Sequence, residues 1–352
     1  MIEPHDAAGS TPNIRTAFRP GPAARRILIV AASGWSAVAV GLAVFAVASV
    51  ALPLGIGPLG FVVVFEEQLL LGATLLLVPL AIATRARHVT LALVVSGLVF
   101  GGLFGSEWAS LPGSAAGRDD LTVLSWNLEY GARTPSEAVG QLQGADADLI
   151  ALVELEPPIS AAIEADPTLT ARYPYRLMVP RDLAWGVGLM SRYPIGEPVS
   201  IYPPACLEVL VATPRGPVRV IVGHPRHASV HGVLRVPLVY DSAPRDVRID
   251  TIRGLIDQSL ASGERLLVLG DFNTTSSEPE YRVLTEGLRD TQTEVGEGPG
   301  WTWRPDQLTW LPFGLIRIDL QLSSGAIRPS ATWVNCSLPG DHCQLFGTYE
   351  ID

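Results

Sequence analysis

The sequence predicts a chain in two parts, a region of three membrane-spanning helices followed by an α/β domain. The membrane region is indicated by charge: between Ile27 and Ser106 only four side chains are formally charged, namely Glu66, Glu67, Arg85 and Arg87. The α/β domain is indicated by alternation. After Leu121, short apolar runs typical of buried strands alternate with segments of helical spacing.

The first predicted span, 27–51, is apolar and uncharged. As a helix rising about 1.5 Å per residue, it is long enough to cross about 30 Å of hydrocarbon. Further spans are predicted at about 60–84 and 88–108. Glu66 and Glu67 interrupt the second span, and three interpretations stay open: an interfacial position with 68–83 carrying most of the crossing, an intramembrane site, or a contact with the following domain.

Arginines flank the predicted spans unevenly. Four precede the first span, and Arg85 and Arg87 separate the second from the third, whereas the loop at 53–58 has no cation. By the positive-inside rule the N-terminus is cytoplasmic, and three crossings of the cell membrane place the α/β domain on the extracytoplasmic side. The predicted organisation is a cytoplasmic tail at 1–26, a transmembrane region at 27–108, a linker at 109–118 and a domain at 119–352.

The α/β domain is acidic. From Asp119 onward it has 30 acidic side chains against 18 arginines, a net formal charge of −12. This balance argues against nucleic acid as a partner. The nearest approach to a basic patch is a set of seven arginines, which we expect to be dispersed and solvated; a single stripe of them beside a metal would favour a nuclease. They are Arg215, Arg219, Arg226, Arg235, Arg245, Arg248 and Arg253.

Three cysteines, Cys206, Cys336 and Cys343, fall in the part placed outside the cytoplasm. An oxidising location permits a disulfide, and Cys336 with Cys343 is the closer pair in sequence. Unpaired buried thiols are equally compatible with this pattern, so the bridge stays open.

Local patterns assign most elements of the domain. Pro214 to Pro217 is a strong turn signal and predicts a hairpin between its flanking strands. Ser277 and Glu280 form a candidate capping box for a helix ending near Leu288. Strands are predicted at 121–126, 148–155, 175–179, 186–191, 207–213, 218–222, 266–269, 316–323 and 343–351, and helices at 135–142 and 245–260.

Polar side chains repeatedly stand where these apolar strands end. Glu154 closes a run so apolar that its burial is costly unless the carboxylate is paired or holds a metal. A divalent metal on carboxylates, a base for water, and amides or imidazoles for phosphoryl oxygens are what phosphate ester hydrolysis requires. The set that can supply them is Asn127, Glu129, Glu154, His224, Asp271, Asn273, Asp319, Asp341 and His342.

These residues lie in segments whose order is informative. The chain reads SWN, LVE, GVGLMSR, VGHP, GDFN, IDLQLSS and GDH between 125 and 342. In this order they resemble the endonuclease/exonuclease/phosphatase superfamily, which includes deoxyribonuclease I, abasic-site endonucleases, inositol polyphosphate 5-phosphatases and neutral sphingomyelinases. The resemblance covers about 121–351 and implies a four-layer α/β sandwich of the DNase I-like type, with the site at one end.

The resemblance also implies a metal site. Glu154 matches the principal Mg²⁺ ligand of the family, with Asn127 beside it and Asp341 as a second carboxylate near the metal. Glu129 stands where several members have an aspartate and is a further candidate. Mn²⁺ is an alternative to Mg²⁺.

The remaining residues match catalytic positions of the family. His224 matches a histidine that contacts the scissile phosphate, and Asp271 with Asn273 matches the pair that positions water and phosphate. His342 cannot take its orienting carboxylate from its sequence neighbour, so Asp319 on another strand is the candidate partner. Whether Asp271 or His342 acts as the base stays open.

The topology narrows the substrate. Three N-terminal spans before an outward-facing domain of this type resemble the VanJ-type membrane proteins of actinobacteria, which are linked to glycopeptide antibiotic resistance and to removal of phosphate from undecaprenyl pyrophosphate. This resemblance implies a Mg²⁺-dependent phosphohydrolase acting on a lipid-linked phosphate or pyrophosphate, with membrane lipids as partners. The alternatives are a cell-surface endonuclease, exonuclease or phosphodiesterase, and a non-catalytic membrane sensor or scaffold. The last would be marked by loss of site residues, and none is missing.

Overall fold

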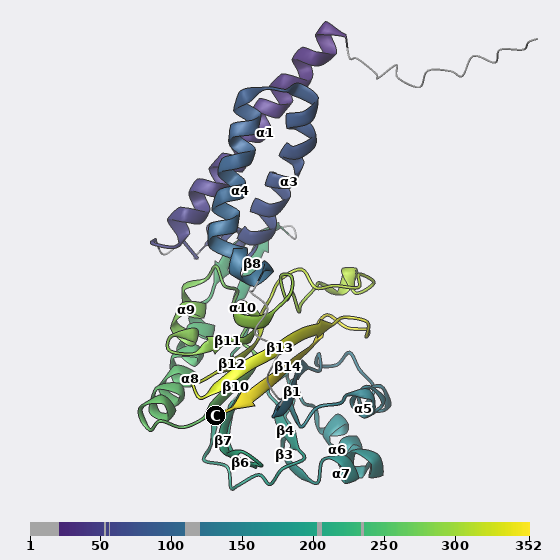
Figure 1. Ribbon diagram of the computed structural model, residues 1–352. Coiled ribbons are helices and arrows are strands. Elements are labelled where there is room, and N and C mark those ends of the chain that lie inside the picture. Colours follow the sequence, from purple (N-terminus) through teal and green to yellow (C-terminus); the bar gives the residue numbers. More distant parts are fainter. Residues whose placement is uncertain (1–20, 53, 56, 110–119, 203–205, 234–235) are drawn as a thin grey trace, which may run out of the picture.

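The computed structural model describes residues 21–352 except 53, 56, 110–119, 203–205 and 234–235. It consists of an apolar helical bundle standing on a domain of two packed sheets (Figure 1). Most of the predicted tail, 1–26, and of the predicted linker, 109–118, lies outside the described residues. Arg15, Arg19 and Arg235 lie outside them as well.

Three helices of the bundle are long and apolar enough to cross a membrane: α1 (Pro22–Ser49), α3 (Glu66–Thr84) and α4 (Arg87–Trp108). A single helix over 60–84 is not formed. A short helix, α2 (Pro58–Val64), is separated from α3 at Phe65, and Glu66 and Glu67 begin the new helix. Acidic side chains are favoured at a helix N-terminus because of the helix dipole, which explains the break at this point.

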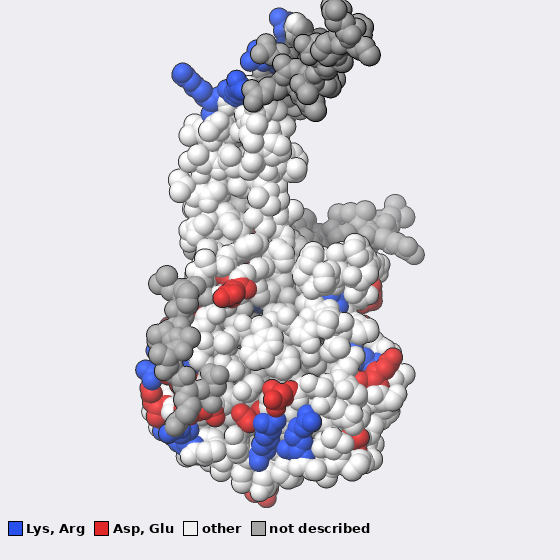
Figure 2. Space-filling model, turned by 45° about the vertical axis from the view of Figure 1, so that its right-hand side comes forward, with Lys and Arg blue, Asp and Glu red and all other residues white. Residues whose placement is uncertain are grey.

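The described arginines of the bundle gather away from the domain. Ser33 of α1 lies 2.9 Å from the ring of His88 in α4, so the start of α1 and the α3–α4 connection are at the same end. Arg25, Arg26, Arg85 and Arg87 therefore share that end, and the side of the bundle is almost free of charge (Figure 2).

The other end of the bundle is joined to the domain by buried polar contacts. Glu67 accepts hydrogen bonds from the indole nitrogens of Trp108 (2.6 Å) and Trp301 (2.9 Å). Of the interpretations left open for the two acids, a contact with the domain is the one that describes Glu67. Glu66 is buried as well, and it accepts a hydrogen bond from Ser49 of α1 at 3.0 Å.

Glu107, near the end of α4, forms a second junction that the charge pattern does not single out. It pairs with Arg317 at 2.9 Å, and both side chains are about 5% exposed. Arg317 also pairs with Asp290 at 2.7 Å. The carbonyl of Trp108 accepts a hydrogen bond from Gly298 at 3.2 Å. The bundle is therefore packed directly on the domain.

The domain has the predicted four-layer sandwich. The first sheet has the order β13-β14-β1-β2-β4-β3, with β1 (Leu121–Asn127), β2 (Leu149–Val153), β3 (Tyr175–Val179), β4 (Val187–Ser191), β13 (Ile327–Asn335) and β14 (Gln344–Ile351). The second has the order β11-β12-β10-β7-β6-β5, with β5 (Ser200–Tyr202), β6 (Cys206–Thr213), β7 (Gly216–Gly223), β10 (Leu266–Asp271), β11 (Arg289–Asp290) and β12 (Asp319–Ser323).

Apolar side chains fill each interval between layers. Val123, Val209 and Leu267 belong to the core between the sheets, which is built by alternate residues of their strands. The outer face of the first sheet is covered by α5 (Pro135–Gly144), α6 (Pro157–Ala165) and α7 (Pro167–Arg172). The second sheet is covered by α8 (Ala243–Ala261) and α9 (Pro279–Thr285), on the opposite side of the sandwich (Figure 1).

The predicted hairpin is confirmed, since β6 and β7 pair antiparallel around Pro214 and Arg215. Other local predictions were incomplete or had the wrong bounds. The structure adds β13, the hairpin β8 (Ser229–Val233) with β9 (Val236–Asp241), α10 (Thr291–Val295) and a 3-10 turn at Asp306–Leu308. The predicted strand 316–323 begins only at Asp319.

The capping box is wrong. Glu278, not Ser277, occupies the N-cap position of α9, and the helix ends at Thr285. The Glu278 carboxylate accepts a hydrogen bond from the Thr275 amide at 2.8 Å and pairs with Arg245 at 2.8 Å. Arg245 also pairs with Glu280, the acid of the predicted box, at 3.1 Å. The local spacing of residues does not indicate either contact.

Candidate active site

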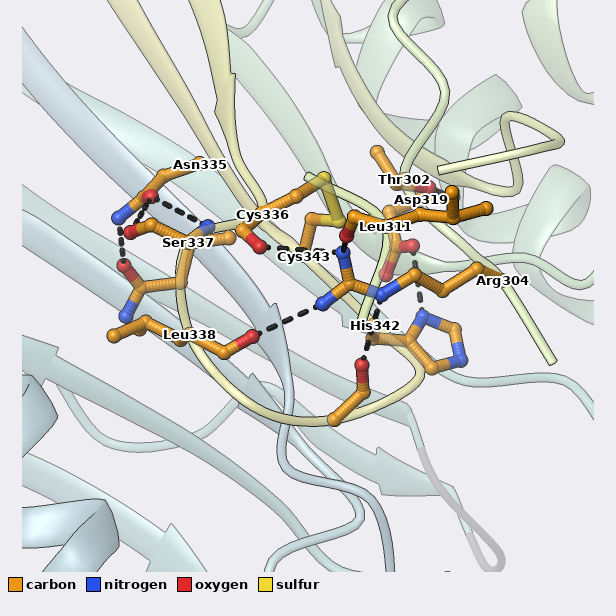
Figure 3. The surroundings of a disulfide bond; sticks show 12 residues. Thr302, Arg304, Leu311, Asp319, Asn335, Cys336, Ser337, Leu338, His342 and Cys343 are labelled. Carbon is orange, nitrogen blue, oxygen red and sulfur yellow. Dashed lines mark hydrogen bonds and ion pairs between the residues drawn. A yellow bond between two sulfur atoms is a disulfide. The ribbon is translucent and has the colours of Figure 1, made fainter. Parts of the chain in front are cut away.

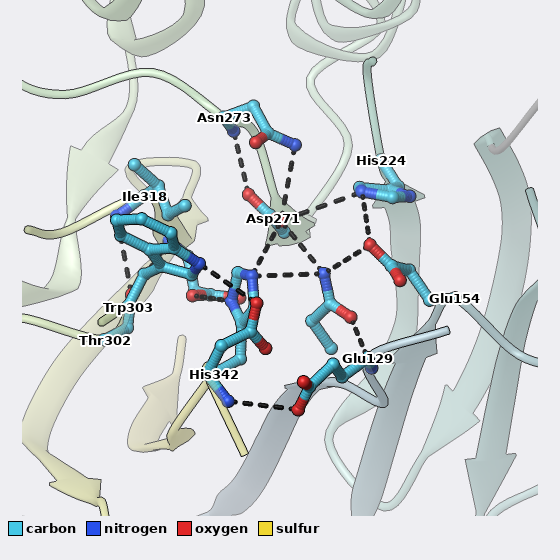
Figure 4. A network of polar contacts seen from close by, with 12 residues as sticks. Glu129, Glu154, His224, Asp271, Asn273, Thr302, Trp303, Ile318 and His342 are labelled. Carbon is cyan, nitrogen blue, oxygen red and sulfur yellow. Dashed lines mark hydrogen bonds and ion pairs between the residues drawn. The ribbon is translucent and has the colours of Figure 1, made fainter. Parts of the chain in front are cut away.

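The predicted site residues are brought to one edge of the sandwich. Asn127 ends β1 and Glu154 directly follows β2, and these strands run parallel. Likewise His224 follows β7 and Asp271 ends β10, a second parallel pair. The carboxyl ends of these strands meet at that edge, since His224 lies 3.5 Å from Glu154 and 3.7 Å from Asp271 (Figure 4). The strand β12 starts there at Asp319.

Several of these side chains are presented by unusual backbone. Glu129, Glu154 and Asn273 have positive φ values of 59°, 56° and 52°. Non-glycine residues seldom adopt this region, and each such residue costs about 1–3 kcal/mol unless its surroundings hold it. Here the side chains are held by hydrogen bonds within the site, so the strain is compensated where the polar groups converge.

Gly270 allows the two strands that carry His224 and Asp271 to approach closely. It pairs with Gly223 of β7 and has a φ of 138°. A Cβ atom at this position would stand 2.0 Å from the carbonyl oxygen of Gly223. This oxygen belongs to backbone and cannot swing aside.

We therefore expect Gly270→Ala to lower the free energy of unfolding by about 3 kcal/mol or more, because it adds a steric clash to an unfavourable φ. Denaturant unfolding of the purified full-length protein measures this. Gly254→Ala is the matched control, since no atom lies within 4 Å of the added Cβ in the middle of α8. It should stabilise by up to about 1 kcal/mol. Equal unfolding midpoints for the two variants would contradict the clash.

Asn127 is at the centre of the polar network. Its amide nitrogen donates to Glu154 and to Asp271, both at 3.0 Å. Its oxygen accepts from the backbone amide of Glu129 at 2.8 Å. The second oxygen of Glu154 accepts from the Tyr130 amide at 2.7 Å, and the ring of His224 lies 3.5 Å from the first. Asn127 thus links the metal and catalytic candidates of both sheets.

The Asp319–His342 pair predicted from the sequence is present. Nδ1 of His342 lies 2.9 Å from Asp319, and Nε2 lies 3.5 Å from Asp271. Asp271 in turn accepts from the amide nitrogen of Asn273 at 2.8 Å and from its side chain at 3.3 Å. The order Asp319, His342, Asp271 is a buried chain of alternating charge.

Burial and these neighbours shift the protonation of the pair. Burial disfavours the imidazolium of His342, but the carboxylates of Asp319 and Asp271 overcome it and raise the pKa of His342 to about 10. Burial raises the pKa of Asp271 to about 6, against the opposing effect of His342. At neutral pH the pair is therefore an imidazolium facing a carboxylate, and the carboxylate is the partner able to accept a proton.

A second acidic group lies beside this pair. Glu129 accepts a hydrogen bond from the Asp341 amide at 3.0 Å, and one oxygen of Asp341 accepts from the Trp303 indole at 3.1 Å. The other oxygen of Asp341, Oδ1, is buried and has no hydrogen-bond partner among the described residues, and the same holds for Oδ1 of Asp319. Ligand atoms of Asp341, Glu129 and Asp306 lie within 4.8 Å of one another, as do those of Asp319, Asp271 and His342. Buried carboxylate oxygens without a donor suit a hard divalent cation.

The segment that carries Asp341 and His342 is held in place by a buried arginine and a disulfide. The guanidinium of Arg304, which is fully buried, donates to the carbonyls of Leu311, Cys336, Leu338 and Gly340 (Figure 3). A disulfide joins Cys336 to Cys343 across the same segment, which resolves the pairing left open by the sequence. Cys206 is the cysteine left unpaired, and it is buried.

The polar network forms one end of a pocket with a volume of about 680 Å³. Glu154, His224, Asp271, Asn273, Asp341 and His342 line it. The sequence did not assign Trp303, which lines the pocket, whereas Trp301 faces Glu67 and Trp108 at the bundle. The sequence around Trp301 and Trp303 does not show which of them lines the pocket. That depends on how the segment that carries both residues is oriented in the folded protein.

The arginines between 215 and 253 do not form one stripe. Arg215, Arg219, Arg245 and Arg253 pair with Asp120, Glu264, Glu278 and Asp257. Arg248 lies over the Trp185 ring. Arg226 is exposed and lines the pocket. The prediction of dispersed side chains is confirmed for the described members of the set.

A two-sheet α/β sandwich with a buried Asp–His pair and clustered carboxylates at one edge defines a metal-dependent phosphoric ester hydrolase. The chain belongs to the Endonuclease/Exonuclease/phosphatase family, whose model matches residues 124–342. The match spans every site residue named above. A search of curated proteins finds no significant match to the whole sequence.

Solved structures share the fold at low identity. The chain is similar to a humanized TDP2 from D. rerio at 16% identity, with a TM-score of 0.51, covering 65% of this chain and 98% of that one. It is also similar to NExo from Neisseria meningitidis, described as a 3′-5′ exonuclease, at 17% identity and a TM-score of 0.50, covering 66% and 100%. The 3′ phosphatase NExo (D146N) from Neisseria, bound to a product DNA hairpin, has 17% identity and a TM-score of 0.50, covering 66% and 99%.

Proposed function

We propose that this protein is a membrane-anchored, Mg²⁺-dependent phosphohydrolase that removes phosphate from a lipid-linked phosphate or pyrophosphate, undecaprenyl pyrophosphate being the example we would test. The observation that carries the proposal is the direct packing of three apolar helices on the catalytic domain through Glu67 and Glu107. A site fixed at a membrane surface meets a lipid substrate at a high effective concentration. The proposed topology resembles that of VanJ-type membrane proteins.

The orientation we propose is a cytoplasmic N-terminus and an extracytoplasmic domain. The arginines gathered at the far end of the bundle support it through the positive-inside rule. The disulfide between Cys336 and Cys343 is compatible with an oxidising compartment.

Glu154 and Asp341 are the carboxylates that we propose hold Mg²⁺, with Asn127 beside them, Glu129 as an additional candidate and Mn²⁺ as a possible substitute. An ion held there would supply positive charge to the phosphoryl oxygens and to the leaving group. The Asn127 amide nitrogen donates to Glu154 and so positions that carboxylate, and its oxygen accepts from the Glu129 amide.

The remaining residues carry the proton and hold the phosphate. Asp271 takes a proton from the attacking water as the new phosphorus–oxygen bond forms. The bond from the terminal phosphorus to the bridging oxygen breaks, and the lipid phosphate departs with that oxygen, as an anion or protonated from solvent. His342, kept cationic and oriented by Asp319, donates to a nonbridging oxygen, as do His224 and Asn273.

The test is phosphate release by full-length protein in detergent with Mg²⁺ or with EDTA. Undecaprenyl pyrophosphate, a phosphodiester lipid and duplex DNA are compared as substrates. We expect turnover of the pyrophosphate that EDTA abolishes and Mg²⁺ restores, and loss of turnover in Glu154→Ala. Cleavage of DNA without any lipid turnover would refute the lipid assignment.

A surface nuclease is the second candidate. It is favoured by the similar Neisseria phosphatase that was solved with product DNA, so the acidic balance of the domain does not exclude nucleic acid. Against it stands the dispersal of the arginines, of which Arg226 alone among the described members of the set lines the pocket. Turnover of DNA in the same assay decides between the two.

A further inference from the structure

The pocket has a second end that the proposed chemistry does not use. Part of its wall is apolar, and several of those apolar residues come from the membrane region. Phe61, Val64 and Phe65, in and directly after α2, line the pocket together with Ala228, Val230 and Tyr240 of the β8–β9 region. The loop that joins two predicted membrane spans therefore completes a cavity whose other end is catalytic.

This wall is firmly attached to the domain. The backbone of Gly57 exchanges hydrogen bonds with that of Tyr240, at 3.0 and 3.2 Å. The rings of Phe61 and Tyr240 meet edge to face with centroids 5.6 Å apart. A Cβ atom at Gly60 would stand 2.5 Å from the Tyr240 ring, so α2 and β9 are in close contact.

Tyr240 also connects the wall to the catalytic side. Its hydroxyl donates to Glu278 at 2.7 Å, and the buried Arg245 donates to that hydroxyl at 2.9 Å. Arg245 donates in addition to the carbonyl of Asn273 at 2.7 Å. The apolar wall and the phosphate-binding candidates are thus held at a fixed separation by one buried network.

Apolar surface continues outward from the pocket. Leu59 on α2 is 45% exposed and Val230 on β8 is 54% exposed, and α2 contains no charged residue. The pocket volume is within the range of small-molecule sites, which are apolar walls with a few convergent polar groups.

We infer that Phe61, Val64 and Phe65 bind the hydrocarbon chain of the substrate next to its phosphate, so that the membrane region sets chain specificity as well as location. This inference rests on the proposed function. In this arrangement the first part of the lipid tail occupies the apolar part of the pocket, and the phosphate headgroup contacts Asp271 and His342. A phosphate ester without a long apolar chain would leave the wall unused.

The experiment compares two pyrophosphates with the same reacting group, undecaprenyl pyrophosphate and the five-carbon isopentenyl pyrophosphate, on full-length protein in one detergent. Val64→Ser and Phe65→Ser should lower the ratio of kcat/KM for the long to the short substrate about tenfold, the loss expected when two methylene groups are no longer buried. Phe65→Leu should retain most of the preference. Leu59→Ser is the matched control on the same helix, because Leu59 does not line the pocket.

The outcomes separate this inference from the function beneath it. A ratio that falls in the pocket variants and holds in Leu59→Ser supports the chain site. If unmodified protein hydrolyses undecaprenyl pyrophosphate but the ratio does not change, or changes equally in the control, the inference is wrong and the lipid phosphohydrolase stands. If unmodified protein does not hydrolyse it, the proposed function fails and the inference falls with it.

Discussion

Asp271→Asn is expected to lower kcat by about 10²–10⁴-fold, the usual contribution of a general base. The change keeps the shape of a side chain that is almost fully buried and removes its ability to accept a proton. Asp271 is the better candidate for the base than His342, because Asp319 and Asp271 raise the pKa of His342 to about 10 despite its burial and so favour its protonated form. Steady-state phosphate release with saturating Mg²⁺ measures the effect.

Asp250→Asn makes the same chemical change at an exposed position of α8 and should leave kcat unchanged. His342→Gln separates the two candidates for the base. If that variant loses the base contribution while Asp271→Asn keeps it, the assignment of Asp271 is wrong. Thermal unfolding of each variant shows whether a loss of rate reflects chemistry or a damaged fold.

Glu107→Ala is expected to lower the free energy of unfolding by about 3–5 kcal/mol, because it leaves the buried guanidinium of Arg317 without one of its two carboxylates. Burial disfavours the charge on Arg317, yet Asp290 and Glu107 raise the pKa of Arg317 well above its ordinary value, so the group stays cationic. For a domain of this size the loss lowers the unfolding temperature by about 6–20 °C. Thermal unfolding in detergent, followed by tryptophan fluorescence, measures it.

Glu294→Ala is the matched control, since Glu294 pairs with Arg289 at 2.9 Å on the surface, with both side chains at least 33% exposed. An exposed pair contributes at most about 1 kcal/mol. Similar unfolding temperatures for the two variants would show that the Glu107–Arg317 pair does not hold the bundle to the domain. Because Arg317 lies two residues before Asp319, the Glu107 variant should lose activity at a lower temperature as well.

The candidate site could be predicted because each of its residues follows a local signal. Glu154 and Asp271 stand at the ends of apolar runs, and such runs form strands whose ends open onto loops. The Asp319–His342 pair also followed from the sequence, since a histidine beside an aspartate needs its partner from elsewhere. Mg²⁺ and the roles of these residues remain predictions.

Long-range contacts explain the errors. The expected capping box does not form, and its acid, Glu280, pairs instead with Arg245, 35 residues away. Arg304 and Trp303 were not recognised as part of the site's support, since their partners are backbone carbonyls and a carboxylate brought close by folding. Nothing in the sequence connects Glu107, near the end of a predicted span, with Arg317, which is 210 residues away.

The class of the fold, the apolar helices and the polar residues at the strand ends could be predicted from local patterns, because hydrophobic periodicity and turn residues act over a few neighbours. That α2 lines the candidate pocket, and that buried charges join the bundle to the domain, is visible in the folded chain alone. Those contacts join residues from about 170 to more than 200 positions apart. The free energy of these contacts comes from burial and charge pairing, and both depend on two distant segments being brought together by folding.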